Sequence, residues 1–392
     1  MESEPRPYEP EETSFARLGR QWHALWRLVL PTREERRYER LLKEDPSFDR
    51  NFYLASNPRL NRLYRHFPER HYVQRGEAAG LCPNPGFAPL AYRLHNPDLD
   101  RPDLRPLAHW IATGRDEARA TLEALDGPPP VPEMPVLGPG DRPSPQARVA
   151  VVLHLHYPDL WPEFAAALAE QGFDFDLYVT SSAAPEAVED LARAVRTDRP
   201  KARIWAVPNR GRDLLPFVHL VGSGLFEGYA AVLKLHGKRS PHRADGAQWR
   251  RALVAGVLGA PERVARRLDT FCALPEAGIW VADGHLCEGA EWWGMNRPRA
   301  AEILARAGIT APDRLRFPAG SIWWARPEML RRIAGLGLGA ADFDPERALV
   351  DGTTAHALER ALGPLAEASG LRLLQGRDLD RLGTGAAFAD RS

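Results

Sequence analysis

Residues Val149-Ala-Val-Val-Leu-His154-Leu-His156-Tyr157 form an apolar run that ends in two histidines and a tyrosine. A short run of aliphatic residues of this kind predicts a buried β-strand. Two further runs end in a similar way, one in Asn209-Arg-Gly-Arg-Asp213 and one in Lys234-Leu-His-Gly-Lys238. In open α/β sheets the ligand crevice lies at the carboxyl ends of the strands. Because Arg, Lys and His gather there, the sequence predicts a site for an anionic group such as a phosphate or diphosphate.

The pattern around this strand continues to the end of the chain. From Arg148 onward, strand-like runs alternate with helix-like runs of about a dozen residues, which predicts an α/β domain with a mostly parallel sheet between two layers of helices. We expect strands at 149–156, 175–181, 203–207, 230–236, 278–282 and 320–325. We expect helices at 160–171, 185–197, 214–223, 245–258, 261–273, 327–335 and 350–361.

A different pattern precedes this domain. Tyr53 and Asn57-Pro58 recur 39 residues later as Tyr92 and Asn96-Pro97, and His71 recurs as His109. Each copy reads as a short helix, an Asn-Pro break and a second helix that ends at Gly. A unit this small buries its apolar face only against a neighbour, so the two copies should pack together and their His and Tyr side chains should be core groups.

The chain therefore divides into four parts. Residues 1–47 contain a tail and a basic amphipathic helix at 15–30, whose apolar face carries Trp22. Such a helix can lie in a membrane interface, but we favour the alternative that its apolar face packs against the protein's own body. Residues 48–125 form the helical repeat, 126–147 a Pro-rich linker, and 148–392 the α/β domain.

The composition excludes several classes of protein. Lys and Arg together number 52 and equal Asp and Glu together, so the formal net charge is zero, which argues against a nucleic-acid binder. Cys82, Cys272 and Cys287 lie far apart, without a Cys-x-x-Cys pair, which indicates neither a disulfide framework nor a zinc knuckle. No apolar run reaches the roughly 18 residues of a membrane span. The first residues lack the basic start and apolar centre of a signal peptide, so we expect a cytoplasmic protein.

The strand ends hold the candidate ligand-binding residues. His154 and His156 share one face of their strand and suit a nucleotide base or ribose, or else form a hydrogen-bonded pair beneath a helix. Arg210 and Arg212 can fork onto phosphate oxygens, while Gly211 permits close approach of a ligand. The alternative is a turn with surface arginines.

Asp213 and the cluster Lys234-Leu-His-Gly-Lys238 are also candidates for binding the anionic ligand. Asp213 can hold an arginine, bond a sugar hydroxyl or cap the following helix. Lys234 and His236 share a face, and Lys238 would follow if the strand continued. Lysine in an apolar strand is costly unless it is paired, so we favour a ligand phosphate over a solvated face.

A third cluster lies in Asp351-Gly-Thr-Thr-Ala-His356-Ala-Leu-Glu359-Arg360. If Thr353 starts a helix, His356 and Arg360 point the same way. One interpretation is helix capping with a surface ion pair. The other is a carboxylate that removes a proton from an acceptor hydroxyl.

In this order the motifs resemble the rhamnan synthesis protein F family of bacterial polysaccharide glycosyltransferases. The resemblance covers about residues 148–375 and rests on five motifs: 154–157, 209–213 with Pro216-Phe217, 234–238, Gly320-Ser-Ile-Trp323 and 351–360. The helical repeat also resembles small modules that precede such domains in bacterial polysaccharide proteins.

The resemblance implies transfer of a sugar, such as rhamnose, from a nucleotide diphosphate donor (dTDP-rhamnose or a UDP-sugar) to a glycan or lipid-linked glycan. It also implies a GT-A-like nucleotide-sugar fold and an inverting mechanism. The implied catalytic residues are Asp351, then Glu359 and His356. The implied donor-binding residues are His154, His156, Tyr157, Asn209, Arg210, Gly211, Arg212, Asp213, Lys234, His236 and Lys238. The implied acceptor-binding residues are Gly320, Ser321, Trp323 and Trp293.

One departure from GT-A enzymes concerns the metal. Those enzymes carry Asp-x-Asp after the fourth strand, where this chain has Lys234-Leu-His-Gly-Lys238. We expect cationic side chains to stabilise the leaving diphosphate in place of a divalent metal. A Mn²⁺ or Mg²⁺ site at Asp283 and His285 stays open as an alternative. Two other functions also stay open: a non-catalytic glycan-binding protein, and a phosphotransferase, although the chain has no Walker-type phosphate loop.

Overall fold

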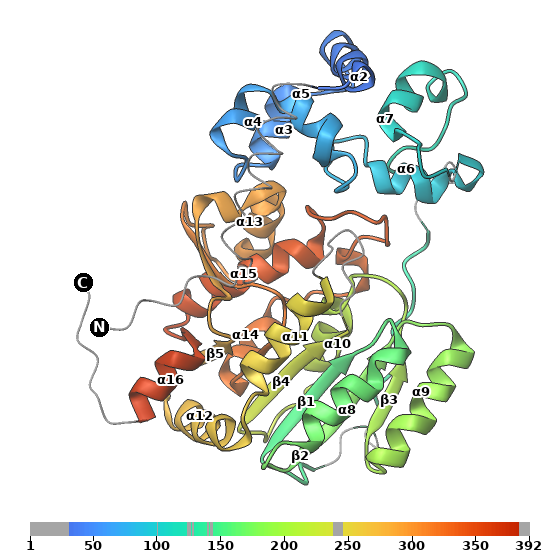
Figure 1. The fold of residues 1–392 in the computed structure, drawn as a ribbon. Helices are drawn as coiled ribbons and strands as arrows, with labels where there is room; N and C mark the ends of the chain where they lie inside the picture. The colour runs from blue at the N-terminus through green and yellow to red at the C-terminus, as the bar shows by residue number, and fades with distance from the viewer. Residues whose placement is uncertain are drawn as a thin grey trace. The chain divides into compact units, whose positions relative to one another are not determined.

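The structure is a computed structural model that describes residues 31–99, 101–123, 127, 129–138, 141, 144–237 and 246–383. Its residues form two compact units, which we describe separately (Figure 1). Of the described residues, the first unit contains those in 131–345 and 353–383, and the second contains those in 31–130 and 346–352. The predicted helix at 15–30 lies outside the described residues.

A seven-stranded sheet forms the centre of the first unit, in the order β3-β2-β1-β4-β8-β5-β9. Only β8 runs antiparallel to its two neighbours, β4 and β5; the other pairings are parallel. The predicted α/β class with a mostly parallel sheet is confirmed. The strands are β1 (Val149–His154), β2 (Phe175–Ser181), β3 (Arg203–Ala206), β4 (Ala231–His236), β5 (Ala277–Val281), β8 (Trp323–Ala325) and β9 (Arg372–Gln375).

Helices cover both faces of this sheet, because both faces of its central strands are apolar. One core cluster joins alternate strand residues to the helices α10, α13, α14 and α15; the other joins the remaining strand residues to α8, α9, α11, α12 and α16 (Figure 1). The first layer comprises α10 (Leu214–Gly222), α13 (Arg297–Ala305), α14 (Pro327–Gly335) and α15 (Thr354–Ala368). The second comprises α8 (Trp161–Ala169), α9 (Pro185–Asp198), α11 (Gly246–Val257), α12 (Pro261–Ala273) and α16 (Gly376–Gly383).

Several elements of this unit were not predicted. A separate antiparallel pair, β6 (Leu286–Gly289) and β7 (Leu315–Pro318), and the helix α13 lie between the predicted strands at 278–282 and 320–325. These strands are only four residues long, too short for a clear alternation of apolar and polar residues. Helix α15 continues seven residues past its predicted end at 361, although it contains Pro364. Its apolar face packs into the core along that whole length, which outweighs the missing backbone hydrogen bond.

The second unit is helical, and its two repeat copies make matching contacts. The Tyr53 hydroxyl lies 2.7 Å from His71 Nδ1, and the Tyr92 hydroxyl lies 2.8 Å from His109 Nδ1. Burial lowers the pKa of His71 to about 4. The helices are α2 (Arg33–Glu44), α3 (Arg50–Ser56), α4 (Arg62–His66), α5 (Pro68–His71), η1 (Tyr72–Gly76), α6 (Pro89–His95), η2 (Pro97–Leu99), α7 (Pro106–His109) and η3 (Trp110–Gly114).

Both copies contribute to one apolar core in this unit. Tyr53 and Tyr92 are fully buried in it. A side chain at Gly76 or Gly114 would collide with the hydroxyl of the tyrosine in the same copy, 2.2 Å and 2.5 Å away. The Tyr, His and Gly of each copy are therefore packing groups, which explains why they recur together in the sequence.

Two segments outside these elements also bear on the organisation of the chain. Residues 129–138 of the Pro-rich stretch contain neither helix nor strand. Among the residues that the structure describes, no helix combines the length and the apolar character needed to cross a bilayer.

The contact between α15 and β7 leaves no room for a side chain at Gly363. A Cβ there would lie 1.6 Å from the Arg316 carbonyl oxygen. We expect Gly363→Ala to force the helix away from the strand and to lower the free energy of unfolding by about 1–3 kcal/mol. Urea denaturation followed by tryptophan fluorescence measures this. The matched control is Gly335→Ala in α14, where no atom lies within 4 Å of the new methyl group. Equal stability of the two variants would contradict the packing argument.

Candidate functional site

The candidate site lies at the carboxyl ends of β1 and β4, which are neighbours in the sheet. His154 pairs in register with His236, and Val152 with Lys234. Even-numbered residues of both strands face the layer of α10 and α15, since Val152 and Val232 belong to that core cluster. The polar side chains that end these strands therefore point to the same side of the sheet.

Lys234 is buried at this edge, with 1% of its surface exposed, and forms an ion pair with Asp213. Its ammonium donates to Asp213 Oδ2, to the Ser321 carbonyl oxygen at 3.0 Å and to Ser321 Oγ at 2.8 Å. Ser321 Oγ in turn donates to Asp213 Oδ2 at 2.8 Å. An ammonium has three N–H groups, and all three have an acceptor here. This lysine therefore has no N–H left for a ligand in this arrangement.

The Asp213 carboxylate is charged in this setting. Burial by itself raises its pKa, but the Coulombic interactions with His236 and Lys234 and the hydrogen bonds from Lys234 and Ser321 outweigh burial. The pKa of Asp213 consequently lies well below its ordinary value.

Gly320 and Ser321 form a turn that links this ion pair to α15. Both have positive φ, 97° and 56°. The Gly320 carbonyl accepts a hydrogen bond from His236 Nε2 at 2.9 Å, and its N–H donates to Glu359 Oε1 at 2.7 Å. A Cβ at Gly320 would lie 2.8 Å from Leu253. Both the positive φ and the close approach thus require glycine at this position.

A second left-handed turn, Gly211-Arg212, precedes α10. The φ angles are 62° and 57°, and a Cβ at Gly211 would lie 2.6 Å from both Leu215 and Phe343. Arg210, just before this turn, is buried and its Nε donates to the Phe343 carbonyl at 2.7 Å. A non-glycine residue in the left-handed region is strained, and such residues gather at functional sites.

Arg212 reaches from this turn to the first turns of α15. Its Nη1 lies 3.1 Å from His356 Nε2. Because a guanidinium can only donate, Nε2 of His356 is the acceptor of this bond. On the other side of the ring, Nδ1 lies 2.8 Å from Thr353 Oγ1 and accepts the Thr353 backbone N–H at 3.4 Å, as part of the capping box that starts α15. Both ring nitrogens of His356 are therefore held by partners in the protein.

The two histidines of the first strand bond to β2 and the residue after it. His154 Nδ1 lies 3.0 Å from Thr180 Oγ1, and His156 Nδ1 lies 3.0 Å from Ser182 Oγ. Burial lowers the pKa of His154 to about 3, more than the nearby carboxylate of Asp213 raises it. His154 is accordingly a neutral hydrogen-bonding group near pH 7. His156 is only half-buried and stacks edge-on against Tyr157.

Comparison with known proteins shows the family to which the chain belongs. The family model for rhamnan synthesis protein F matches residues 135–371, more than half of the chain and all of the site described above. The chain belongs to the rhamnan synthesis protein F family.

Two curated relatives extend the comparison. The proteins named "Uncharacterized protein WxcX", from two strains of Xanthomonas campestris pv. campestris (ATCC 33913 and B100), are each 36% identical to this chain over 231 residues. The match covers 59% of this chain and 32% of each relative, so the chain spans about a third of the length of the curated relatives it matches.

A solved structure is also similar. The mannosyltransferase PcManGT from Pyrobaculum calidifontis, in complex with GDP-Man and Mn²⁺, aligns over 58% of this chain and 54% of its own, with 14% identity and a TM-score of 0.31. A likeness of this extent says nothing about the ligands of this chain.

Among the residues expected to bind an acceptor, the two tryptophans take core positions. Trp323 is fully buried and lies edge-on to Phe217, and Trp293 is 3% exposed, with its indole N–H bonded to the Pro312 carbonyl. Neither presents a ring face to solvent. Gly320 and Ser321, by contrast, lie within the network of hydrogen bonds at the strand ends.

The remaining predicted residues are distributed as follows. Asn209 is exposed on the loop before the left-handed turn. Lys238 lies outside the described residues. Asp351 belongs to the helical unit, where, after burial, its charge contributes to raising the pKa of Cys82 to about 11. Thr353, which the sequence predicts to start a helix, is the N-cap of α15, but the sequence does not single out Thr180 or Ser182. Hydroxyl residues at strand and helix ends are too common in sequences to signal these contacts.

The alternative metal site at Asp283 and His285 has other contacts. Asp283 Oδ1 accepts the Arg377 N–H at 2.9 Å, and its carbonyl lies 3.1 Å from His285 Nδ1. Within the described residues, no three His, Cys, Asp or Glu side chains gather as a set of metal ligands.

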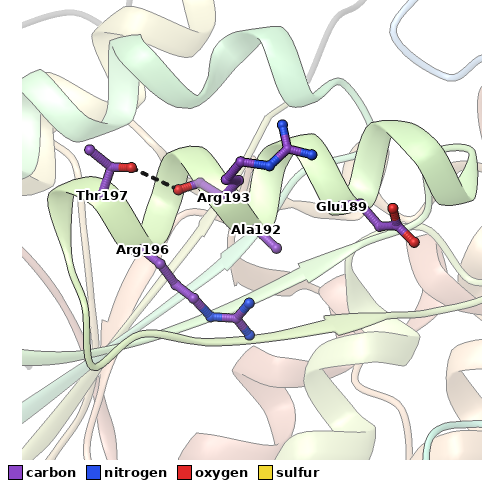
Figure 2. A pocket seen from close by; sticks show the side chains of 5 residues that line it. All are labelled: Glu189, Ala192, Arg193, Arg196 and Thr197. Carbon is purple, nitrogen blue, oxygen red and sulfur yellow. Dashed lines mark hydrogen bonds between the residues drawn. The ribbon is translucent and has the colours of Figure 1, made fainter.

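A surface hollow of about 540 Å³ lies away from these strand ends, on α9 (Figure 2). The side chains that line it all come from this one helix: Glu189, Ala192, Arg193, Arg196 and Thr197. Thr197 Oγ1 donates to the Arg193 carbonyl at 3.0 Å, and Arg193 pairs with Asp190 at 2.9 Å. Since these are ordinary bonds within a helix, we keep the candidate site at the strand ends.

His154 should make stability depend on pH. Its pKa is lowered to about 3 in the folded chain, whereas an exposed histidine titrates near 6.5. Below about pH 6.5 this histidine binds a proton in the unfolded chain but not in the folded chain. The free energy of unfolding therefore falls by up to about 1.4 kcal/mol per pH unit on acidification. We expect His154→Asn, which cannot titrate, to lose about 2 kcal/mol less than the wild type between pH 7 and pH 5. Urea denaturation at both pH values measures this, and equal losses would contradict a neutral His154.

Proposed function

We propose that this chain is an inverting glycosyltransferase that moves a sugar, rhamnose or a similar one, from a nucleoside diphosphate to a growing bacterial surface polysaccharide. The observation that carries the proposal is the cluster of cationic residues and strained turns at the carboxyl ends of β1 and β4, in a chain of the rhamnan synthesis protein F family. This edge of an α/β sheet is where ligands bind.

The donor side of the site takes the nucleotide and its diphosphate. His154, His156 and Tyr157 line the nucleotide side, with neutral His154 as a hydrogen-bonding group. The diphosphate lies against Arg210 and Arg212 of the 209–213 loop. Arg210 brings positive charge to this place, since its Nε is bonded to an uncharged partner, the Phe343 carbonyl. Arg212 adds a second guanidinium beside it, 3.1 Å from His356 Nε2.

Asp351 is the proposed base that takes the proton from the acceptor hydroxyl. The geometry of Glu359 makes it the weaker choice. Its Oε1 accepts the Gly320 N–H at 2.7 Å and its Oε2 lies 3.5 Å from Arg360 Nη1, so both carboxylate oxygens already have partners within the protein. His356 presents its Nε2 lone pair to Arg212, so it is suited to positioning more than to proton transfer.

Cationic side chains, rather than a divalent metal, stabilise the leaving diphosphate in this proposal. The acceptor is a glycan or a lipid-linked glycan. Such an enzyme would work in the cytoplasm, at the inner face of the membrane, with the basic segment 15–30 as the membrane contact.

The donor class can be identified by thermal unfolding with dTDP-rhamnose and with UDP-, GDP- and CDP-linked sugars, each with Mn²⁺ and with EDTA. We expect one nucleotide class to raise Tm selectively, by roughly 5–10 °C at a hundredfold excess over Kd, because binding to the folded state stabilises it. The shift should persist in EDTA. A shift that requires Mn²⁺ would contradict the metal-free diphosphate site, and no shift with any donor would favour a non-catalytic glycan-binding protein.

Asp351→Asn tests the proposed base. The amide cannot accept a proton but has the same size, so we expect turnover to fall at least about 100-fold while donor binding is retained. The measurement is release of the nucleoside diphosphate in the presence of acceptor, with donor affinity measured in parallel. Asp313→Asn, on an exposed aspartate paired only at the surface with Arg297, is the matched control and should remain active. Full activity of Asp351→Asn would contradict its role as the base and would leave Glu359 as the candidate.

A further inference from the structure

The buried ion pair of Lys234 and Asp213 connects three segments that are far apart in the chain. Asp213 follows the left-handed turn Gly211-Arg212, and Lys234 lies on β4. Ser321 belongs to the second left-handed turn and bonds to both charges. One pair of opposite charges thus holds both strained turns.

Each of these turns also holds a residue of α15. Arg212 of the first turn donates to His356, and the Gly320 N–H of the second turn donates to Glu359. His356 and Glu359 are one helical turn apart on the same side of α15. The ion pair is therefore linked to α15 in two places: through Arg212 to His356, and through Gly320 to Glu359.

The surroundings of Lys234 favour a holding role over a ligand-binding role. Its three N–H groups have three acceptors, and its ammonium lies 5.6 Å and 5.7 Å from the ring centres of Phe217 and Trp323. If the ammonium turned from Asp213 toward a ligand, the Asp213 carboxylate would lose its ion pair, which is costly for a charge held in the interior.

We propose that Lys234 and Asp213 are positioning residues of the transfer site. Together they hold the turns Gly211-Arg212 and Gly320-Ser321 so that Arg212 keeps its contact with His356 and Gly320 its contact with Glu359. Neither residue of the pair contacts the donor diphosphate. The part of this inference that concerns the donor rests on the proposed function. The part that concerns the turns stands without it.

Three variants separate this role from direct binding of phosphate: Lys234→Met, Asp213→Asn and the double variant. The double variant removes both charges and leaves neither buried alone, so it is the one most certain to fold. Lys201→Met is the matched control, because this exposed lysine lies just before β3, at the opposite end of the sheet.

The first measurement is hydrogen exchange at the Gly320 amide, which needs no nucleotide. We expect exchange at least tenfold faster in the double variant than in the wild type or in Lys201→Met, with the amides of β1 unchanged. Unchanged exchange at Gly320 would show that the pair does not hold the turn and would overturn the proposal. If the wild type binds no nucleoside diphosphate, this measurement still decides the positioning role while the proposed function fails.

The second measurement is the affinity for dTDP, UDP, GDP and CDP, together with kcat and KM. A positioning role predicts that Lys234→Met and Asp213→Asn change affinity in the same direction, that the double variant is no worse than either, and that kcat falls more than KM rises. Direct phosphate binding predicts opposite signs, because Asp213→Asn removes a negative charge near the anion. Opposite signs would therefore overturn the proposal.

Discussion

The structure of the site depends on one constraint, which is that the ammonium of Lys234 is buried in the middle of an apolar strand. A charge in such a place is tolerated only where acceptors surround it. Asp213 supplies one from the loop after β3, and Ser321 supplies two from the turn before β8. Both segments must therefore contact Lys234 on β4. This contact fixes the positions of the two loops at the carboxyl edge of the sheet.

The same constraint explains why the backbone is strained here and not elsewhere in this unit's sheet. Arg212 and Ser321 both have positive φ, and each is next to, or bonded to, Asp213. Non-glycine residues stay in this region only where the surroundings hold them, at a cost of about 1–3 kcal/mol each. The ion pair and the contacts of Arg212 and Gly320 with α15 provide these surroundings.

The sequence predicted most of this architecture because periodicity is a local property. The runs around β1, β2 and β4 are apolar on both faces, and the boundaries predicted for α9 and α14 differ from the structure by at most one residue. The direction of β8 and the pairing of β6 with β7 depend on contacts distant in sequence, which no local pattern contains. The roles of the cations were unpredictable for the same reason: His236 and Arg210 bond to the carbonyls of Gly320 and Phe343, 84 and 133 residues away.

Whether a cationic side chain adds positive charge to the site depends on the residue to which it is bonded. The charge of Lys234 is compensated by Asp213, so this pair adds little net charge to the strand ends. Arg210 donates to the Phe343 carbonyl, and this bond fixes its guanidinium group without cancelling its charge. A cluster that looks uniformly cationic in the sequence is thus divided in the structure. The lysine on the strand is neutralised within an ion pair and holds the turns of the site, whereas Arg210 of the 209–213 loop contributes a positive charge that an anionic ligand would meet.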